Sequence, residues 1–348
     1  MNISLLRPWA LLLSVFVLAG HASSCSSNDG ELGVANKQDI EMQSVCIGRY
    51  VMELPVRWKR QQAGVDSGGD ATFYFGHDEN FTKIDASVED GVAEKDFESA
   101  VNARESLLRE KENFSIDASM FLSREEIGPK VALLSSYASV DSTDAIRLEV
   151  HAMVGQSHVV LGETAYSPAA RPGVQTRLIS MLSTAHGLDD RASEEGGGFC
   201  VGGVVFEPES DYEESGIAYA GTFAGVPVKL QVDINSFDQP SNEPGLIERG
   251  ERNLDGLGVR PKKLRAGPRQ LAGLGGEEWL GAFDENGQRL HGFYAETSAR
   301  KPARESPSLM LSLLTGDEEG GPEAKSIDDD SAIALWDQVL ASIRKRSG

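Results

Sequence analysis

The chain has 348 residues, 40% of them hydrophobic, and its 54 acidic residues outnumber 33 basic ones to give a net charge of −21. This length and apolar content suffice for two ordinary hydrophobic cores. Because so acidic a surface repels phosphate backbones and anionic head groups, the composition excludes a nucleic-acid-binding protein and a protein held on membranes by charge.

The N-terminus has the pattern of an export signal. Arg7 is the only charged residue before residue 29, and an apolar run follows at 10–19. That run is shorter than the roughly 20 apolar residues that a membrane-crossing helix needs. A basic end, a short apolar centre and the small residues 22–24 are typical of a secretory signal. We expect residues 1–24 to direct export across a bacterial inner membrane, with the mature protein in the periplasm.

Cys25 stands where a bacterial lipoprotein keeps its acylated cysteine, directly after Ala-Ser-Ser. The alternative is ordinary cleavage after Ser24, which leaves a free thiol. With acylation, Ser26 lacks the aspartate associated with inner-membrane retention, which favours the outer membrane. Residues 25–44 are polar and are predicted to form a tether. This lipid anchor is the only membrane contact that the sequence predicts.

The other two cysteines are Cys46 and Cys200. In an oxidising compartment, with Cys25 acylated, they remain as a possible disulfide pair. The alternative is two buried thiols, which behave as small core residues.

The first half, residues 45–187, is predicted to be an α+β domain. Apolar residues at helical spacing predict helices over 97–111 and 172–186. Gly155-Gln156 is typical of a hairpin turn. Strands are expected at 46–55, 71–75, 83–88, 123–127, 130–139, 146–154 and 157–165.

The second half, residues 199–348, follows an acidic, glycine-rich linker at 188–198. It repeats the same order of elements, with helices expected near 246–254 and at 331–345. Strands are expected at 200–208, 217–223, 226–234, 263–266, 269–283, 288–299 and 308–314. The predicted fold is therefore α+β, with two successive similar domains, each a mostly antiparallel sheet with helices.

Motifs that carry chemistry are missing from the sequence. There is no Gly-x-Ser-x-Gly elbow and no phosphate-binding Gly-x-x-x-x-Gly-Lys. The histidines show no metal-ligand spacing; His151 and His158 are instead expected to meet across a hairpin as a polar pair. The sequence thus predicts no catalytic residue, no metal and no cofactor, and favours a binding protein over an enzyme.

Two segments carry a family resemblance. Cys46-Ile-Gly-Arg-Tyr-Val-Met-Glu-Leu-Pro55 follows the export signal, and Gly198-Phe199-Cys200 opens the second half. Together they resemble the immunity proteins paired with type VI secretion phospholipase effectors, and more narrowly the class-four lipase immunity family, over residues 45 to about 346. The resemblance implies a non-enzymatic periplasmic protein that binds and neutralises a phospholipase delivered by another cell. The alternative is an envelope lipoprotein with a structural or chaperone-like role.

The resemblance transfers no contact residue, because such loops diverge with the partner. A protein without catalytic groups inhibits only by binding, so we expect it to block access of lipid to the enzyme. Two acidic segments are candidate partner contacts, with ordinary solvated loops as the alternative: Asp211, Glu213 and Glu214, and Asp317, Glu318 and Glu319. Arg49 is expected in a strand, in an ion pair.

Overall fold

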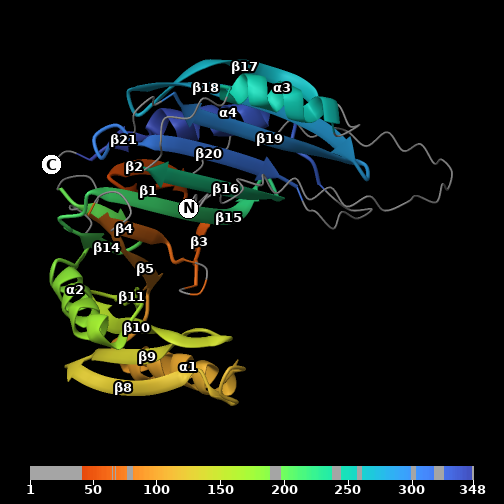
Figure 1. Ribbon diagram of the computed structural model, residues 1–348. Coiled ribbons are helices and arrows are strands. Elements are labelled where there is room, and N and C mark those ends of the chain that lie inside the picture. Colours follow the sequence, from red (N-terminus) through yellow and green to blue (C-terminus); the bar gives the residue numbers. More distant parts are fainter. Residues whose placement is uncertain are drawn as a thin grey trace. The chain divides into compact units, whose positions relative to one another are not determined.

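The computed structural model (Figure 1) describes residues 41–346 except 65, 67, 77–80, 189–196, 237–243, 257–260, 299–302 and 317–324. The predicted signal, Cys25 and most of the tether therefore lie outside the described residues. Residues 39–348 form one compact unit. Antiparallel sheets and four α-helices make up its described part, which confirms the α+β prediction.

The larger sheet runs in the order β17-β18-β19-β20-β16-β15-β4-β5-β11-β10-β9-β8, with β3 (Lys59–Gln61) paired to β15. Its first-half strands are β4 (Ala71–Phe75), β5 (Thr82–Asp90), β8 (Phe121–Gly128), β9 (Val131–Ser139), β10 (Ser142–Val154) and β11 (Ser157–Ala165). Its second-half strands are β15 (Tyr212–Phe223), β16 (Val226–Asn235), β17 (Lys262–Leu271), β18 (Leu274–Glu285), β19 (Gln288–Thr297) and β20 (Ser308–Thr315).

The two halves join inside this sheet. Strand β15 pairs with β4, from Tyr212 opposite Tyr74 to Ser215 opposite Ala71. Each half has the same strand order, because β4-β5-β11-β10-β9-β8 corresponds to β15-β16-β20-β19-β18-β17. One sheet nevertheless runs through both halves, so the finer prediction of two successive similar domains divided at 188–198 is not shown.

A second sheet interlocks the halves. Its order is β12-β14-β13-β1-β2-β21, with β1 (Met42–Gly48), β2 (Tyr50–Pro55), β12 (His186–Gly187), β13 (Phe199–Val201), β14 (Val204–Phe206) and β21 (Arg344–Lys345). The strand that closes each half pairs with the other half: β12 with β14, and β21 with β2. Strand β1 begins three residues inside the predicted tether.

The strands predicted at 46–55 and 200–208 are each a tight hairpin instead. The chain reverses at Gly48 and at Gly202, which have φ of +58° and +55°. Glycine adopts this left-handed conformation without a steric penalty. The predicted break near residue 267 was also wrong, because Pro268 lies within β17 opposite Glu277. Strand β17 is at the end of the sheet, where a proline without an N–H is tolerated.

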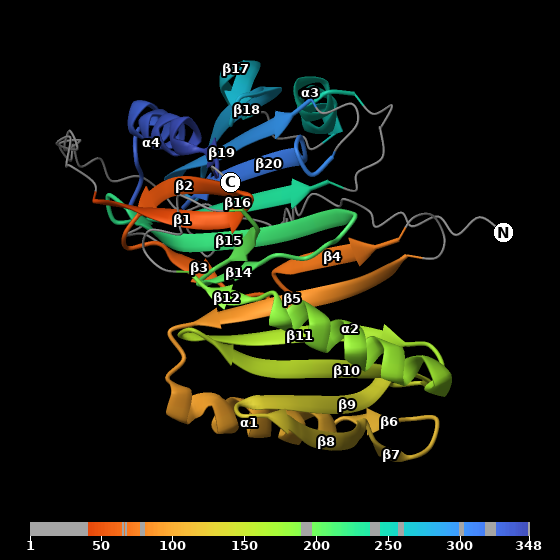
Figure 2. The ribbon, with the colours of Figure 1, turned by 90° about the vertical axis from the view of Figure 1, so that its left-hand side faces the viewer.

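Helices cover both faces of the first-half sheet (Figure 2). Helix α1 (Phe97–Glu110) packs with Ala132 and Leu134 of β9, whereas α2 (Arg171–Ser183) shares a core with Leu133. Alternate residues of a strand point to opposite faces, so these helices lie on opposite sides. In the second half, α3 (Leu246–Gly256) contacts β18, and α4 (Asp329–Ser342) contacts β2, β17 and β19.

One apolar core extends across both halves. Strand β16 alternates between buried apolar and half-buried residues, and its inward face consists of Val226, Val228, Leu230, Val232 and Ile234. These side chains share a cluster with Phe73 of β4, Leu161 of β11 and Trp336 of α4. The sheet junction and the common core together hold the two halves as a single unit.

Candidate partner-binding surface

The described residues contain little that points to catalysis. Among them, no group of three or more His, Cys, Asp or Glu is placed to hold a metal ion. A buried cavity of ≈ 10 Å³ between β2 and β20 is lined by apolar side chains and has room for about one water molecule. A surface recess of ≈ 500 Å³ carries the charges of Glu94 and Lys130, which pair with each other. Neither recess brings a nucleophile beside a base.

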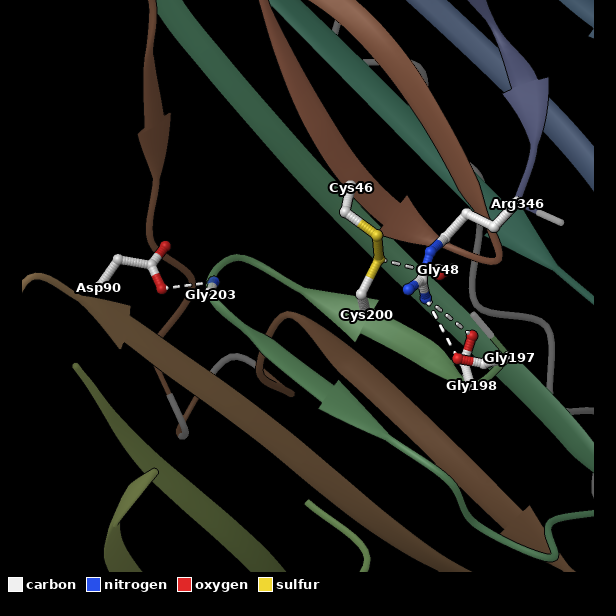
Figure 3. The surroundings of a disulfide bond; sticks show 8 residues. All are labelled: Cys46, Gly48, Asp90, Gly197, Gly198, Cys200, Gly203 and Arg346. Carbon is white, nitrogen blue, oxygen red and sulfur yellow. Dashed lines mark hydrogen bonds between the residues drawn. A yellow bond between two sulfur atoms is a disulfide. The ribbon is translucent and has the colours of Figure 1, made fainter. Parts of the chain in front are cut away.

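A disulfide ties the two halves together. Cys46 in β1 and Cys200 in β13 are bonded, with their Cα atoms 5.9 Å apart and a sequence separation of 154. Figure 3 shows this bond next to Arg346, whose guanidinium donates to the carbonyls of Gly197 and Gly198. The disulfide proposed from the cysteine count thus links the two halves within the second sheet, where β1 lies next to β13.

Glu213, predicted as a partner contact, is a buried structural group. It lies in β15 and is 2% exposed. Nε and Nη2 of Arg49 donate to its two carboxylate oxygens over 2.7 and 2.6 Å, and Nη2 of Arg304 lies 3.4 Å away. The hydrogen bond to Glu213 raises the pKa of the Arg49 guanidinium. The prediction of an exposed acidic loop at 211–214 was therefore wrong, because Glu213 is buried within a strand. The ion pair expected for Arg49 is present.

The other acidic candidates divide into two groups. Glu214 is half-buried in β15 and accepts a hydrogen bond from the Tyr74 hydroxyl over 2.7 Å. The Asp211 carboxylate accepts from the backbone N–H of Gly76 over 2.6 Å. Both half-buried groups bond to strand β4 or to the residue that follows it. Asp317, Glu318 and Glu319 lie outside the described residues, and their contact role stays a prediction.

A buried polar cluster lies in the first half. Nδ1 of His151 and Nε2 of His158 are 3.2 Å apart, as expected for a cross-strand pair. Glu149, 1% exposed, accepts from Nε and Nη2 of Arg104 over 2.9 and 2.7 Å. Burial raises its pKa, but the hydrogen bonds and charge of Arg104, together with His151, whose Nε2 lies 3.6 Å from the carboxylate, outweigh this and lower the pKa to about 2. Burial, assisted by the charge of His151, lowers the pKa of His158 to about 4.

Acid should destabilise the protein through His158. The unfolded chain takes up this proton near pH 6.5, whereas the folded chain takes it up near pH 4, so stability falls as the pH drops between these values. The loss of unfolding free energy from this group should approach about 3 kcal/mol. Urea unfolding measures the free energy of unfolding at pH 7 and at pH 4.5. Its decrease between these two pH values should be about 2–3 kcal/mol smaller in His158→Gln than in the parent protein.

The matched control is His186→Gln, which removes an exposed imidazole. It should retain the acid-induced drop of the parent protein. Equal drops in the parent and in His158→Gln would contradict the assignment.

Sequence reasoning missed a group of exposed apolar side chains. Phe114 and Ile116 lie in the turn between β6 (Glu112–Asn113) and β7 (Ala118–Ser119) and are 70% and 45% exposed. Buried Asn113 fixes this turn, because its side chain donates to the carbonyls of Ser139 and Ser142 over 3.1 and 2.9 Å. The available signal was two large apolar residues in an otherwise polar turn.

Three further large apolar residues are exposed. Leu107 lies in the last turn of α1, and Leu122 lies near the start of β8. Tyr166, 79% exposed, directly follows β11, whose last residue pairs with Ile146 near the start of β10.

Comparison with known proteins assigns the second half to a family. The model of the Tle cognate immunity protein 4 C-terminal domain matches residues 194–348. This second half is therefore similar to the C-terminal domain of the Tle cognate immunity protein 4 family. The family is one of immunity proteins, in agreement with the prediction of a non-enzymatic inhibitor. A search of curated proteins gives no significant match to this sequence.

Three solved structures share the fold over 88% of this chain. The apo structure of the immunity protein TplEi of the T6SS from Pseudomonas aeruginosa is 19% identical, with a TM-score of 0.62 and 98% of its chain covered. The same protein complexed with "L" peptide is 19% identical, with a TM-score of 0.60 and 99% of its chain covered. A chain of the Tle4–Tli4 complex is 20% identical, with a TM-score of 0.63 and 98% of its chain covered. The family's fold therefore covers both halves of this chain.

No helix in the described ranges has both the length and the apolar content to cross a lipid bilayer.

Proposed function

We propose that this protein is an immunity protein that binds and neutralises a Tle4-like phospholipase effector of a type VI secretion system. The match of residues 194–348 to the immunity family carries the proposal. The shared fold supports it, because one of the similar structures is a Tle4–Tli4 complex. Neither the small apolar cavity nor the surface recess described above places a nucleophile beside a base, which favours inhibition by binding.

The proposed mechanism is a block of lipid access to the enzyme. An inhibitor that performs no chemistry acts by occupying the substrate entrance or by holding a closed state. A standard protein–protein interface of about 1,600 Å² is large enough to cover such an entrance. The net charge of −21 would speed encounter with a basic partner, and salt should weaken this effect.

The proposed location is the periplasm, with Cys25 acylated and anchored in the outer membrane. The predicted export signal and the Cys46–Cys200 disulfide support an oxidising compartment. A phospholipase that attacks membrane lipids from the periplasm would meet the inhibitor there.

The test is to express the lipase encoded by the neighbouring gene in the periplasm, with and without this protein. We expect survival only when both are present, and a stable complex of the purified proteins at micromolar concentration. Equal killing in both cultures together with no complex would refute the proposal. If the complex spares membrane lipids while still hydrolysing soluble short-chain esters, the block is at lipid access; loss of both activities would place it at the catalytic site.

A further inference from the structure

Two buried histidines of the first half share one hydrogen bond. Nδ1 of His151 in β10 and Nε2 of His158 in β11 lie 3.2 Å apart, and the stacked rings have centroids 5.3 Å apart. The two residues are 2% and 5% exposed. In a bond between two imidazoles one nitrogen donates and the other accepts, so at least one ring must be neutral. A second proton leaves two positive rings in contact, with no acceptor between them.

Helix α1 covers this pair, and we infer that the two histidines form an acid-sensitive latch that holds α1 on the first-half sheet. His151 lies directly opposite Ala132, which packs with α1, so its side chain points to the face that α1 covers. Phe97, the first residue of α1, meets the His158 ring edge-on, with ring centroids 5.8 Å apart. Release of α1 would therefore open the imidazole pair to water.

Of the elements that enclose the pair, α1 has the smaller hold on the rest of the protein. Strands β10 and β11 pair with each other without interruption, from Ile146 opposite Ala165 to Val154 opposite Ser157. Helix α1 packs on a separate small core and not on the main one: Phe97, Val101, Leu108, Ala132 and Leu134. An element with few buried apolar contacts opens at a lower free energy than the central strands of a sheet. Acid that breaks the imidazole pair should therefore release the helix before it disrupts the sheet.

The charged groups that face the pair come from α1, β5, β10 and the loop before β4. Glu149 of β10 is buried 3.6 Å from one imidazole, but it already accepts two hydrogen bonds from Arg104 of α1. Asp66 of the loop is the other partner of Arg104, and Glu89 of β5 lies 3.9 Å from Nδ1 of His158. The side chains of Asp66 and Glu89 are 66% and 49% exposed, so solvent screens their charges. With both rings protonated, three cations would share one buried carboxylate.

Proton uptake makes this arrangement a switch. Burial and the charge of His151 lower the pKa of His158 to about 4, whereas a ring exposed by the release of α1 takes up its proton near pH 6.5. The equilibrium constant for release should therefore rise about 50-fold between pH 7 and pH 4.5. The latch would exist whatever partner the protein binds. In the proposed periplasmic location it would make the first-half surface respond to external acid.

Amide hydrogen exchange of the whole protein at pH 7 and at pH 4.5 tests the latch. Protection factors, which correct for the intrinsic pH dependence of exchange, are compared for α1 and for α2, the helix on the opposite face. We expect the protection of α1 to fall about 50-fold between the two pH values, and that of α2 less than about 3-fold. An equal loss in both helices would show that acid acts on the whole chain, and unchanged protection of α1 would show that it is not released. Either result overturns the inference.

Two variants identify the group responsible. His158→Gln keeps a polar side chain but takes up no proton, so the protection of α1 should fall less than about 3-fold. His186→Gln removes an exposed imidazole and should behave like the parent. If His158→Gln is folded at pH 7 and still loses the protection of α1 as strongly as the parent, the latch is refuted. Should His158→Gln not fold, the comparison of α1 with α2 in the parent protein decides alone.

Discussion

Replacing both Cys46 and Cys200 by alanine should lower the free energy of unfolding by about 4–5 kcal/mol. The disulfide closes a loop over 154 residues, so its loss greatly increases the conformational freedom of the unfolded chain. Both cysteines are buried, in a small cluster with Val51 and Val205. The bond also joins strands from the two halves, so the smaller sheet should separate first. Urea unfolding under oxidising conditions measures the difference.

Cys25→Ala is the matched control, because it removes the third cysteine without affecting the bond. It should unfold like the parent. Dithiothreitol separates the cross-link from packing: it should destabilise the parent, and should leave the double alanine variant unchanged. A parent protein whose unfolding midpoint does not respond to complete reduction would show that the bond contributes little.

The sequence predicted well those strands, turns and helix starts whose patterns lie within a few neighbouring residues. Strand 71–75 has the predicted bounds, and the turn at Gly155-Gln156 joins β10 to β11 as expected. The last helix, expected at 331–345, begins with a local cap, because the Asp328 carboxylate accepts from the Ser331 N–H over 2.8 Å. These features depend on alternation, turn residues and caps, which lie within a few residues of one another.

Pairing over long sequence separations was not predictable. Nothing near β4 indicates that its partner is β15, about 140 residues later, and the predicted division into two domains did not include this pairing. The closing strands β12 and β21 have two residues each, too few for a period of two to be visible. Their pairing with the opposite half is set by the tertiary fold.

The candidate site was the least predictable part for the same reason. An acidic run such as 211–214 reads as a solvated loop until the fold places Arg49 against it. Conversely, Phe114 and Ile116 read as ordinary apolar residues until the fold leaves them exposed. Burial of a charge or exposure of an aromatic side chain depends on which distant segments arrive beside it, and a local pattern does not contain that information.

Removing Glu213 should show how much the junction depends on one buried charge. Glu213→Ala should lower the free energy of unfolding by about 3–5 kcal/mol, because it leaves Arg49 without its counter-ion at a partly buried site. Arg346 aggravates the loss, because burial and, to a smaller extent, the positive charge of Arg49 already lower the pKa of the Arg346 guanidinium. Urea unfolding at pH 7 gives the difference directly.

Neighbouring Glu214→Ala is the matched control for Glu213→Ala, because it removes a glutamate from the same strand. It loses one hydrogen bond, from Tyr74, and should cost about 1–2 kcal/mol. The double variant Arg49→Ala/Glu213→Ala should lose less than the sum of the two single variants, because the second substitution removes a charge that the first left unpaired. If Glu213→Ala costs no more than Glu214→Ala and instead weakens binding of the lipase, then Glu213 is a partner contact as the sequence suggested, and the buried ion pair does not hold the junction.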